Sequence, residues 1–264
     1  MNPLHPKILA DGTQVLESGL LASRRFPHAF STRIGPGGQS FDLARPGESF
    51  LGTSNQTLLD HLARFSRLLR SDAPEVATAR QVHGTAMVDG ARAGAAEADI
   101  VVSTSSDRAV AVRTADCVPI LIACPKTRIV AAVHAGWRGL VADAPGRAVW
   151  HLASLGADRK DLLAAIGPAI GLDRFEIGSE VADEFESSGL GSCIRIGSPR
   201  PHADLFNAAL RRLLAAGIPT ASIDGAPCCT SADPRFFSHR AESGRTGRHL
   251  SGIIGGKSPI DEGE

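Results

Sequence analysis

Two short apolar runs separated by a charged turn most strongly constrain the fold of this chain. The runs are Val118–Ala123 and Ile129–Val133, and the segment 124–128 between them has turn chemistry and a charged tip. This pattern predicts a β-hairpin. Both of its faces are apolar, which is typical of strands that are covered on both sides. We therefore expect the hairpin to be fully buried.

The register of this hairpin brings a thiol and an imidazole together. A turn centred on Pro125 and Lys126 would set Cys117 directly opposite His134 on one face, with Cβ atoms roughly 5 Å apart. Three interpretations are open for this pair. The cysteine is a small buried hydrophobe beside a hydrogen-bonded core histidine, or the two form a Cys-His nucleophile, or both bind a metal. A metal site needs a further ligand, and His83 is available.

Composition narrows the class of protein and of partner. The chain has 264 residues, 43% hydrophobic and 21% charged, with 28 basic and 28 acidic side chains. This balance is typical of a globular protein and argues against nucleic acid or an anionic membrane as partner. Tyr is absent and aromatic residues make up 5%, so the stacking surface of a single-strand binder is missing.

Cysteine usage and hydropathy suggest a compartment. No segment reaches about 18 uninterrupted apolar residues, and the N-terminal segment lacks the apolar core of a signal peptide. The five cysteines are odd in number and lack the spacing of a secreted disulfide framework. We expect a cytoplasmic protein with small-molecule partners, either a monomer or a homodimer.

The remaining periodicity predicts alternating helices and strands. The helices are expected over 54–69 with Ser54 or Asn55 as N-cap, over 139–155 with a break at Pro145 or a start after Asp143, over 179–186, and over 204–216. The strands are expected over 75–81, 100–103, 109–113 and 162–166. No repeat or linker divides the chain, so we predict one α/β domain over residues 1–254 and a flexible tail over 255–264.

Five segments of the sequence resemble the laccase-domain family. They are Gln81–Gly84, Thr114–Pro119, Ala132–Gly139, Gly167–Gly171 and Phe236–Arg240. The string His-Ala-Gly-Trp-Arg-Gly together with Thr-Ala-Asp-Cys is highly specific, and the resemblance runs from about residue 30 to residue 254. Members of the family have been called polyphenol oxidases, multicopper-oxidase-like proteins, peptidoglycan editing factors and, more recently, zinc-dependent purine nucleoside phosphorylases.

The resemblance implies a fold and a metal site. The fold is a single-domain four-layer α/β/β/α sandwich with mixed sheets, and Zn²⁺ is held by two histidines and a cysteine. By motif these ligands are His83, Cys117 and His134, the trio that the hairpin argument assembles. Cu²⁺ is the alternative metal for such a set by affinity. A multicopper oxidase is disfavoured, because the nine histidines contain no His-x-His pair.

The implied activity is phosphorolysis of adenosine, inosine and methylthioadenosine, with deamination of adenosine. A metal with these three ligands leaves a fourth position for water and lowers the pKa of that water to about 7, which suits attack at the purine C6. Phosphorolysis instead needs a bound phosphate, and the guanidinium fork of arginine suits phosphate. The arginines considered for this role are Arg33, Arg113, Arg138, Arg240 and Arg248, with Arg33 the best placed because it precedes a Gly-rich turn.

Further substrate contacts are expected from residues in or near the matching segments. Arg33 matches the Ser-Thr-Arg position of the family, and Asn55 matches an Asn near the start of the family's first helix. Gln81 and Ser238 lie within the matching segments. We predict that all four contact the substrate.

Two aspartates raise separate questions. Asp116 lies beside Cys117, and it either orients a ligand, acts as an acid or base, or caps a turn; we assign it a catalytic role together with Cys117 and Arg33. Asp42 stands where the family commonly has an Asn. A carboxylate only accepts hydrogen bonds, so the role of that amide is open in this chain.

Two other enzymes and a non-enzymatic function compete with this prediction. One enzyme is a Cys-His amidohydrolase that edits peptidoglycan precursors, with Cys117 as nucleophile and His134 as base. The other is a copper-dependent polyphenol oxidase. A metal-stabilised interaction module is the non-enzymatic alternative.

Overall fold

The computed structural model describes residues 1–69, 76–197 and 199–255, so residue 75 and positions 256–264 of the predicted tail lie outside it. The helices are α1 (Gly19–Ser23), α2 (Asn55–Leu68), α3 (Trp137–Val141), α4 (Ala144–Ser154), α5 (Ser179–Ser187) and α6 (Leu205–Ala215). The strands are β1 (His5–Ile8), β2 (Gln14–Glu17), β3 (His28–Ser31), β4 (Met87–Asp89), β5 (Ile100–Ser103), β6 (Val110–Thr114), β7 (Val118–Ala123), β8 (Val130–Ala135), β9 (Leu163–Ile166), β10 (Ile194–Arg195), β11 (His202–Ala203), β12 (Ile223–Asp224) and β13 (His249–Ile253).

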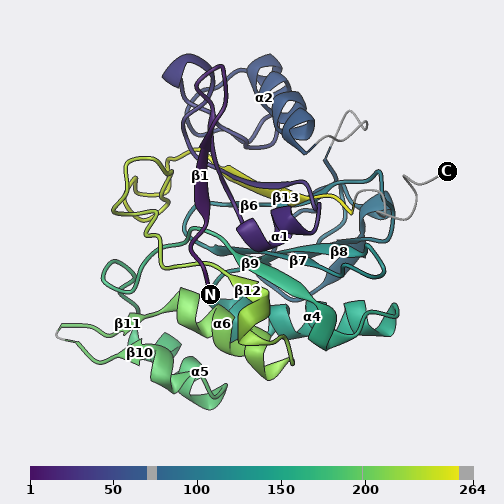
Figure 1. Cartoon of the computed structure of the whole chain (residues 1–264). Coiled ribbons are helices and arrows are strands. Elements are labelled where there is room, and N and C mark those ends of the chain that lie inside the picture. The colour runs from purple at the N-terminus through teal and green to yellow at the C-terminus, as the bar shows by residue number, and fades with distance from the viewer. Residues whose placement is uncertain (70–75, 198, 256–264) are drawn as a thin grey trace.

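Two large sheets form the centre of the molecule (Figure 1). One has the strand order β1-β2-β3-β13-β6 and is antiparallel throughout. The other has the order β12-β9-β7-β8-β5-β4 and is mixed, because β12 pairs with β9 and β4 with β5 in parallel. Strand β13 lies between β3 and β6, so the two ends of the chain share a sheet. Among the helices of the described residues, none combines the length and apolarity that a membrane crossing requires.

The predicted hairpin is confirmed as β7 and β8, and every residue of both strands is buried. The predicted register is wrong. His134 pairs with Pro119, so Cys117 lies diagonally across from it rather than directly opposite. The turn is centred one residue later than expected, because Arg128 takes a left-handed conformation (φ 61°) and its N–H donates to the carbonyl of Cys124 at 2.9 Å. A register that differs by two residues keeps every side chain on its expected face.

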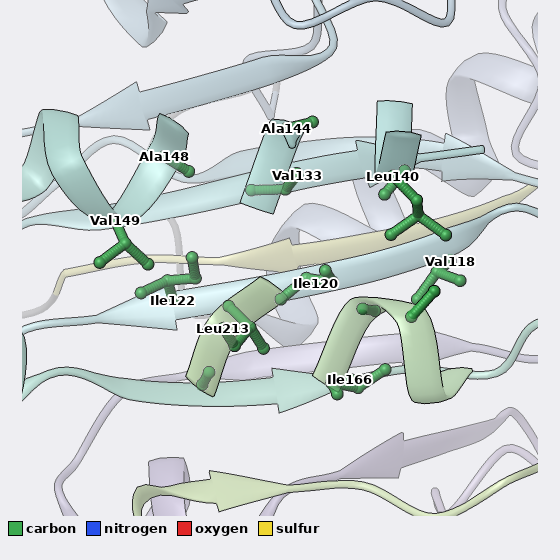
Figure 2. Close-up of a cluster of buried hydrophobic side chains, with 14 of the residues drawn as sticks. Val118, Ile120, Ile122, Val133, Leu140, Ala144, Ala148, Val149, Ile166 and Leu213 are labelled. Carbon is green, nitrogen blue, oxygen red and sulfur yellow. The ribbon is translucent and has the colours of Figure 1, made fainter. Parts of the chain in front are cut away.

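Three apolar layers separate the sheets and helices, which confirms the predicted four-layer α/β/β/α sandwich. Figure 2 shows the layer in which side chains of β7, β8 and β9 pack against α3, α4 and α6. Ile120 and Val149 in this layer are completely buried, and each such side chain contributes roughly 1.5–3 kcal/mol to stability. The second layer lies between the two sheets, and the third lies between the antiparallel sheet and α2.

Capping residues explain where the helices begin. Ser54 accepts a hydrogen bond from the N–H of Thr57 at the start of α2, as predicted. The helix expected over 139–155 is two helices, because Asp143 has a left-handed φ of 62° and caps α4. Predicted helices over 179–186 and 204–216 correspond to α5 and α6. The predicted strands over 100–103, 109–113 and 162–166 correspond to β5, β6 and β9.

The strand expected over 75–81 is not confirmed by the described residues 76–81. Ala77 forms an isolated bridge with Val110, and Arg80 forms another with Glu97. This segment therefore crosses from the edge of one sheet toward the other, and no single neighbour accompanies it for more than one residue pair. The crossing brings the chain to His83 at the boundary between the two sheets.

A buried histidine joins β13 to the loop that follows β12. His249 is 3% exposed, and its Nε2 accepts a hydrogen bond from the N–H of Phe237 at 2.8 Å. Burial, together with the nearby charges of Arg33 and Arg248, lowers the pKa of His249 to about 4. The same Nε2 lies 3.3 Å from the carbonyl of Phe237, a contact that favours protonation but does not outweigh the burial.

We predict that this histidine makes the fold sensitive to acid. The unfolded chain gains a proton at His249 below about pH 6.5 while the folded chain does not until about pH 4, so folding loses about 2 kcal/mol between pH 7 and pH 5. Urea unfolding of the chelator-treated protein at the two pH values measures this loss. His249→Gln should show a smaller pH dependence, and equal dependence in both proteins would contradict the assignment.

Candidate functional site

Three potential metal ligands converge where the hairpin meets the segment before β4. Cys117 immediately precedes β7, His134 lies in β8, and His83 lies in the connection that leads to β4. Their ligand atoms all lie within 4.8 Å of one another. The two imidazole rings meet edge to face, with centroids 4.8 Å apart. His134 is buried and His83 is exposed, so the cluster is open to solvent on one side.

A fully buried carboxylate that the sequence analysis did not assign holds two of these ligands. Asp99 accepts a hydrogen bond from Nδ1 of His134 at 2.7 Å, which leaves Nε2 of that ring for the cluster. It also accepts from the N–H groups of His83 at 2.9 Å and Gly84 at 2.7 Å. Burial alone would raise the pKa of Asp99, but these hydrogen bonds outweigh it and lower the pKa. An acidic residue at the start of a buried strand was the only signal of this role in the sequence.

Two non-glycine residues of the site, one of them a ligand, have left-handed backbones. His83 has φ 60° and Asp116 has φ 89°, conformations that cost roughly 1–3 kcal/mol unless their surroundings enforce them. Asp99 enforces the first. The second is enforced by the side chain of Asp116 itself, whose carboxylate oxygens accept from Thr230 Oγ1 at 2.6 Å and from the N–H of Arg240 at 2.7 Å. Each oxygen thus has one partner from a distant segment, and these contacts position the loop that carries Asp116.

The shape and chemistry of the cluster fit a transition metal. A Cβ atom added at Gly136 would lie 3.0 Å from His83 Cδ2 and 3.1 Å from Cys117 Sγ, so a side chain here would crowd two of the ligands. One thiolate and two imidazoles are a donor set that suits zinc or copper. Three protein ligands also leave one tetrahedral position open, as catalytic sites require.

The thiol and the buried imidazole polarise each other. Burial alone would raise the pKa of Cys117, but the charge and hydrogen bonds of His134 and His83 outweigh it and bring the pKa well below the usual range of a thiol. Burial likewise opposes protonation of His134, while Cys117 and Asp99 overcome it and raise the pKa of His134. The cluster therefore favours a thiolate, which is the form that binds a metal or attacks an electrophile.

The cluster lines a cavity of about 790 Å³ whose wall is rich in arginine. The arginines are Arg45, Arg80, Arg113, Arg138, Arg240 and Arg248, whereas the carboxylates are Glu48 and Asp116. Phe50, Trp137 and Phe175 add aromatic surface to the same wall. A metal site that opens into a cationic, partly aromatic cavity can bind an anion and a planar ring together.

The structure brings some predicted site residues to this cavity and leaves others elsewhere. Gln81, Arg113, Arg138, Arg240, Arg248 and Asp116 line it, whereas Arg33, Asn55 and Ser238 do not. Arg33 instead forms an ion pair with Glu242 at 2.9 Å. Ser238 accepts a hydrogen bond from the N–H of Ala241, and so stabilises its own loop. Arg33 therefore lies outside the lining of this cavity, and its contact with the substrate stays a prediction.

The loop between β3 and α2 explains Asp42 and Asn55. Asp42 is completely buried and accepts hydrogen bonds from the N–H groups of Ala44 and Arg248 and from the hydroxyl of Ser49. Asn55 accepts from the N–H of Gly47 at 2.7 Å. Neither side chain lines the cavity, and both hold the loop that does.

Proteins of known sequence resemble this chain over most of its length. A sequence profile of the family described as "Multi-copper polyphenol oxidoreductase laccase" matches residues 27–255. A protein from Deinococcus radiodurans named purine nucleoside phosphorylase is 34% identical, over 93% of this chain and 94% of the relative. A protein of the same name from Mycobacterium tuberculosis is 35% identical, over 80% of this chain and 84% of the relative.

Solved structures share the fold. YlmD from Geobacillus stearothermophilus superposes with a TM-score of 0.83 at 26% identity, over 97% of this chain and all of that protein (100%). A hypothetical protein YfiH from Bacillus licheniformis superposes with a TM-score of 0.81 at 24% identity, over 94% and 98% of the two chains. The second likeness, at this identity, concerns the fold alone.

Asp99 provides a test of the cluster as a metal site. Asp99→Asn removes the charge that orients His134 and places an amide opposite backbone N–H groups, so we expect the dissociation constant for zinc to rise about 10- to 100-fold. Competition with a chromophoric chelator measures it. Glu97→Gln, two residues away and exposed, removes the same charge and should bind zinc as the wild type does. Unchanged zinc affinity in a folded Asp99→Asn protein would contradict the positioning role.

Proposed function

Because the chain belongs to the multi-copper polyphenol oxidoreductase laccase family, we propose that it is a zinc-dependent purine nucleoside phosphorylase. Its substrates would be adenosine, inosine and methylthioadenosine with inorganic phosphate, and it would also deaminate adenosine. The observation that carries the proposal is the cluster of His83, Cys117 and His134 at the wall of an arginine-rich cavity. Residues 1–254 would act as one domain.

The donor set supports the choice of metal. His83, Cys117 and His134 would hold Zn²⁺, which supplies Lewis acidity to whichever group takes its open position. Asp99 would keep His134 in the tautomer that offers Nε2. The same three ligands can also bind copper. The described residues contain a single such cluster, whereas a multicopper oxidase needs several metal centres.

The cavity supports phosphorolysis through its charge. In that reaction an oxygen of phosphate bonds to C1′ of the ribose while the bond from C1′ to the base breaks. The base keeps the electron pair and gains a proton, which balances the proton that the phosphate gives up. Arginine side chains lower the barrier by holding the phosphate in position for attack on C1′ through charge-assisted hydrogen bonds. Phe50 and Phe175 offer apolar faces to the purine and ribose.

A second candidate function is favoured by the same buried carboxylate. Cys117, His134 and Asp99 stand in the order of nucleophile, base and orienting acid, which is the arrangement of a cysteine hydrolase. An amidohydrolase acting on a peptidoglycan precursor would use these residues without a metal. In that case His83 would have no assigned role, although it hydrogen-bonds to the same thiol.

The first test of the proposal measures both metal and products. We expect about one zinc per purified chain, and release of adenine from adenosine only when phosphate is present. Cys117→Ala removes the charged ligand, so zinc occupancy should fall at least tenfold and phosphorolysis on the order of 10²-fold. Base release that needs no phosphate would refute the proposed reaction. Full zinc occupancy in the variant would refute the assignment of Cys117 as a ligand.

The second test separates metal from nucleophile. In Cys117→His the new imidazole can still bind zinc, but its nitrogen reaches farther than Sγ, and a displacement of about 1 Å can cost on the order of 10²-fold in rate. We expect low turnover that rises with added zinc and falls with chelator. Under the nucleophile hypothesis activity disappears whatever the zinc concentration. Cys117→Ala in excess zinc is the matched control, and a His variant with no more zinc than the Ala variant would argue against the ligand role.

A further inference from the structure

Two arginines of the cavity wall come from adjoining segments, because Arg113 donates to the carbonyl of Leu43, two residues before Arg45. Arg113 of β6 and Arg45 of the loop before α2 both line the cavity. Among the residues that the structure describes, no carboxylate lies within the 4.0 Å ion-pair distance of either guanidinium. Glu48 lines the same wall but forms no such pair. Cations placed together in this way repel each other unless an anion joins them.

Arg113 is held rigidly in place. Its Nε donates to the carbonyl of Leu43 at 2.7 Å and its Nη1 to Thr78 Oγ1 at 2.8 Å. Its backbone is clamped by the side-chain amide of Gln81, which accepts from the N–H of Arg113 at 2.8 Å and donates to its carbonyl at 2.6 Å. Nη2 has no partner among the described residues. The guanidinium therefore presents a free edge whose orientation is already fixed.

The guanidinium of Arg113 is largely shielded from solvent. Burial and the positive charge of Arg45 lower the pKa of Arg113 to about 10 against the opposing charges of Glu48 and Asp42, so the guanidinium stays charged at neutral pH. The side chain of Arg45 makes one hydrogen bond, from Nη2 to the carbonyl of Gly94 at 3.2 Å. Its loop is fixed by Asp42 and Asn55, which bond to the N–H groups at positions 44 and 47. Both cations are thus held ready before any ligand arrives.

We propose that Arg113 and Arg45 form a phosphate-group subsite of the cavity. A rigid guanidinium edge and a second cation match the several acceptor oxygens of a phosphate better than the two of a carboxylate. Arg113 precedes Cys117 by four residues, so their Cα atoms are at most about 14 Å apart and one ligand can span both groups. This inference rests on the proposed nucleoside substrate for its setting. The ligand is inorganic phosphate or the 5′-phosphate of a nucleotide.

The test uses two variants of the full chain, Arg45→Gln and Arg113→Gln. The first breaks one exposed hydrogen bond and leaves the fold intact even if the second does not. With phosphate varied at fixed adenosine, we expect the KM for phosphate to rise about 10- to 100-fold in each variant. With adenosine varied at fixed phosphate, the KM for adenosine should change less than twofold. Arg92→Gln, an exposed arginine outside the cavity wall, is the charge-matched control and should leave both constants unchanged.

A second arm distinguishes the source of the phosphate group. Inhibition of adenosine turnover by AMP is measured in the same proteins. A raised inhibition constant for AMP with an unchanged KM for phosphate would assign the subsite to the 5′-phosphate of a nucleotide. A raised KM for phosphate alone would assign it to inorganic phosphate. If neither constant changes in Arg45→Gln, the subsite does not exist.

A third readout does not depend on the proposed reaction. Phosphate binding to a cationic site raises the unfolding temperature, so the shift caused by inorganic phosphate or AMP should be present in the wild type and lost in Arg45→Gln. If the wild type shows no phosphorolysis but this shift is lost in the variant, the proposed function fails and the subsite stands. If phosphorolysis occurs and neither variant differs from Arg92→Gln, the subsite fails and the function stands.

Discussion

The buried carboxylate of Asp99 is the contact on which the arrangement of the site depends. It lies directly before β5 and accepts hydrogen bonds from a side chain of β8 and from the backbone that carries His83. A carboxylate that is buried away from water needs such hydrogen-bond donors, because leaving it unpaired would cost several kcal/mol of folding free energy. The requirement to satisfy one anion therefore fixes the relative position of two histidines from segments far apart in the sequence.

A comparable device organises the cationic wall of the cavity. The fully buried Asp42 receives hydrogen bonds from backbone groups at positions 44 and 248, and Asp116 receives them from Thr230 and from the backbone of Arg240. Each aspartate holds a loop that carries an arginine to the wall. Six arginines against two carboxylates line the cavity among the described residues, and this excess of positive charge suits a phosphate-containing substrate.

The same cluster is compatible with two kinds of chemistry for a physical reason. A thiolate beside an oriented imidazole is both a metal ligand and a nucleophile. The feature that favours a metal is His83, which hydrogen-bonds to the same sulfur, while the missing side chain of Gly136 avoids crowding both ligands. A hydrolase needs neither the second imidazole nor that space. The exposed face of His83 gives a ligand access to the cluster from the cavity.

Local patterns in the sequence predicted the hairpin, the helical segments from α2 to α6, the strands β5, β6 and β9, and the faces that β7 and β8 bury. Alternation assigned the two faces of β7 and β8, and even a register error of two residues left them unchanged, because side chains repeat every two residues along a strand. That His83, Cys117 and His134 come together was also predicted without coordinates. Only the tertiary structure decided that Asp99 joins these ligands, that Arg113 faces the cavity, and that Arg33 pairs with Glu242. Those contacts link residues from different layers, and the periodicity of one segment carries no information about the partner it meets across the core.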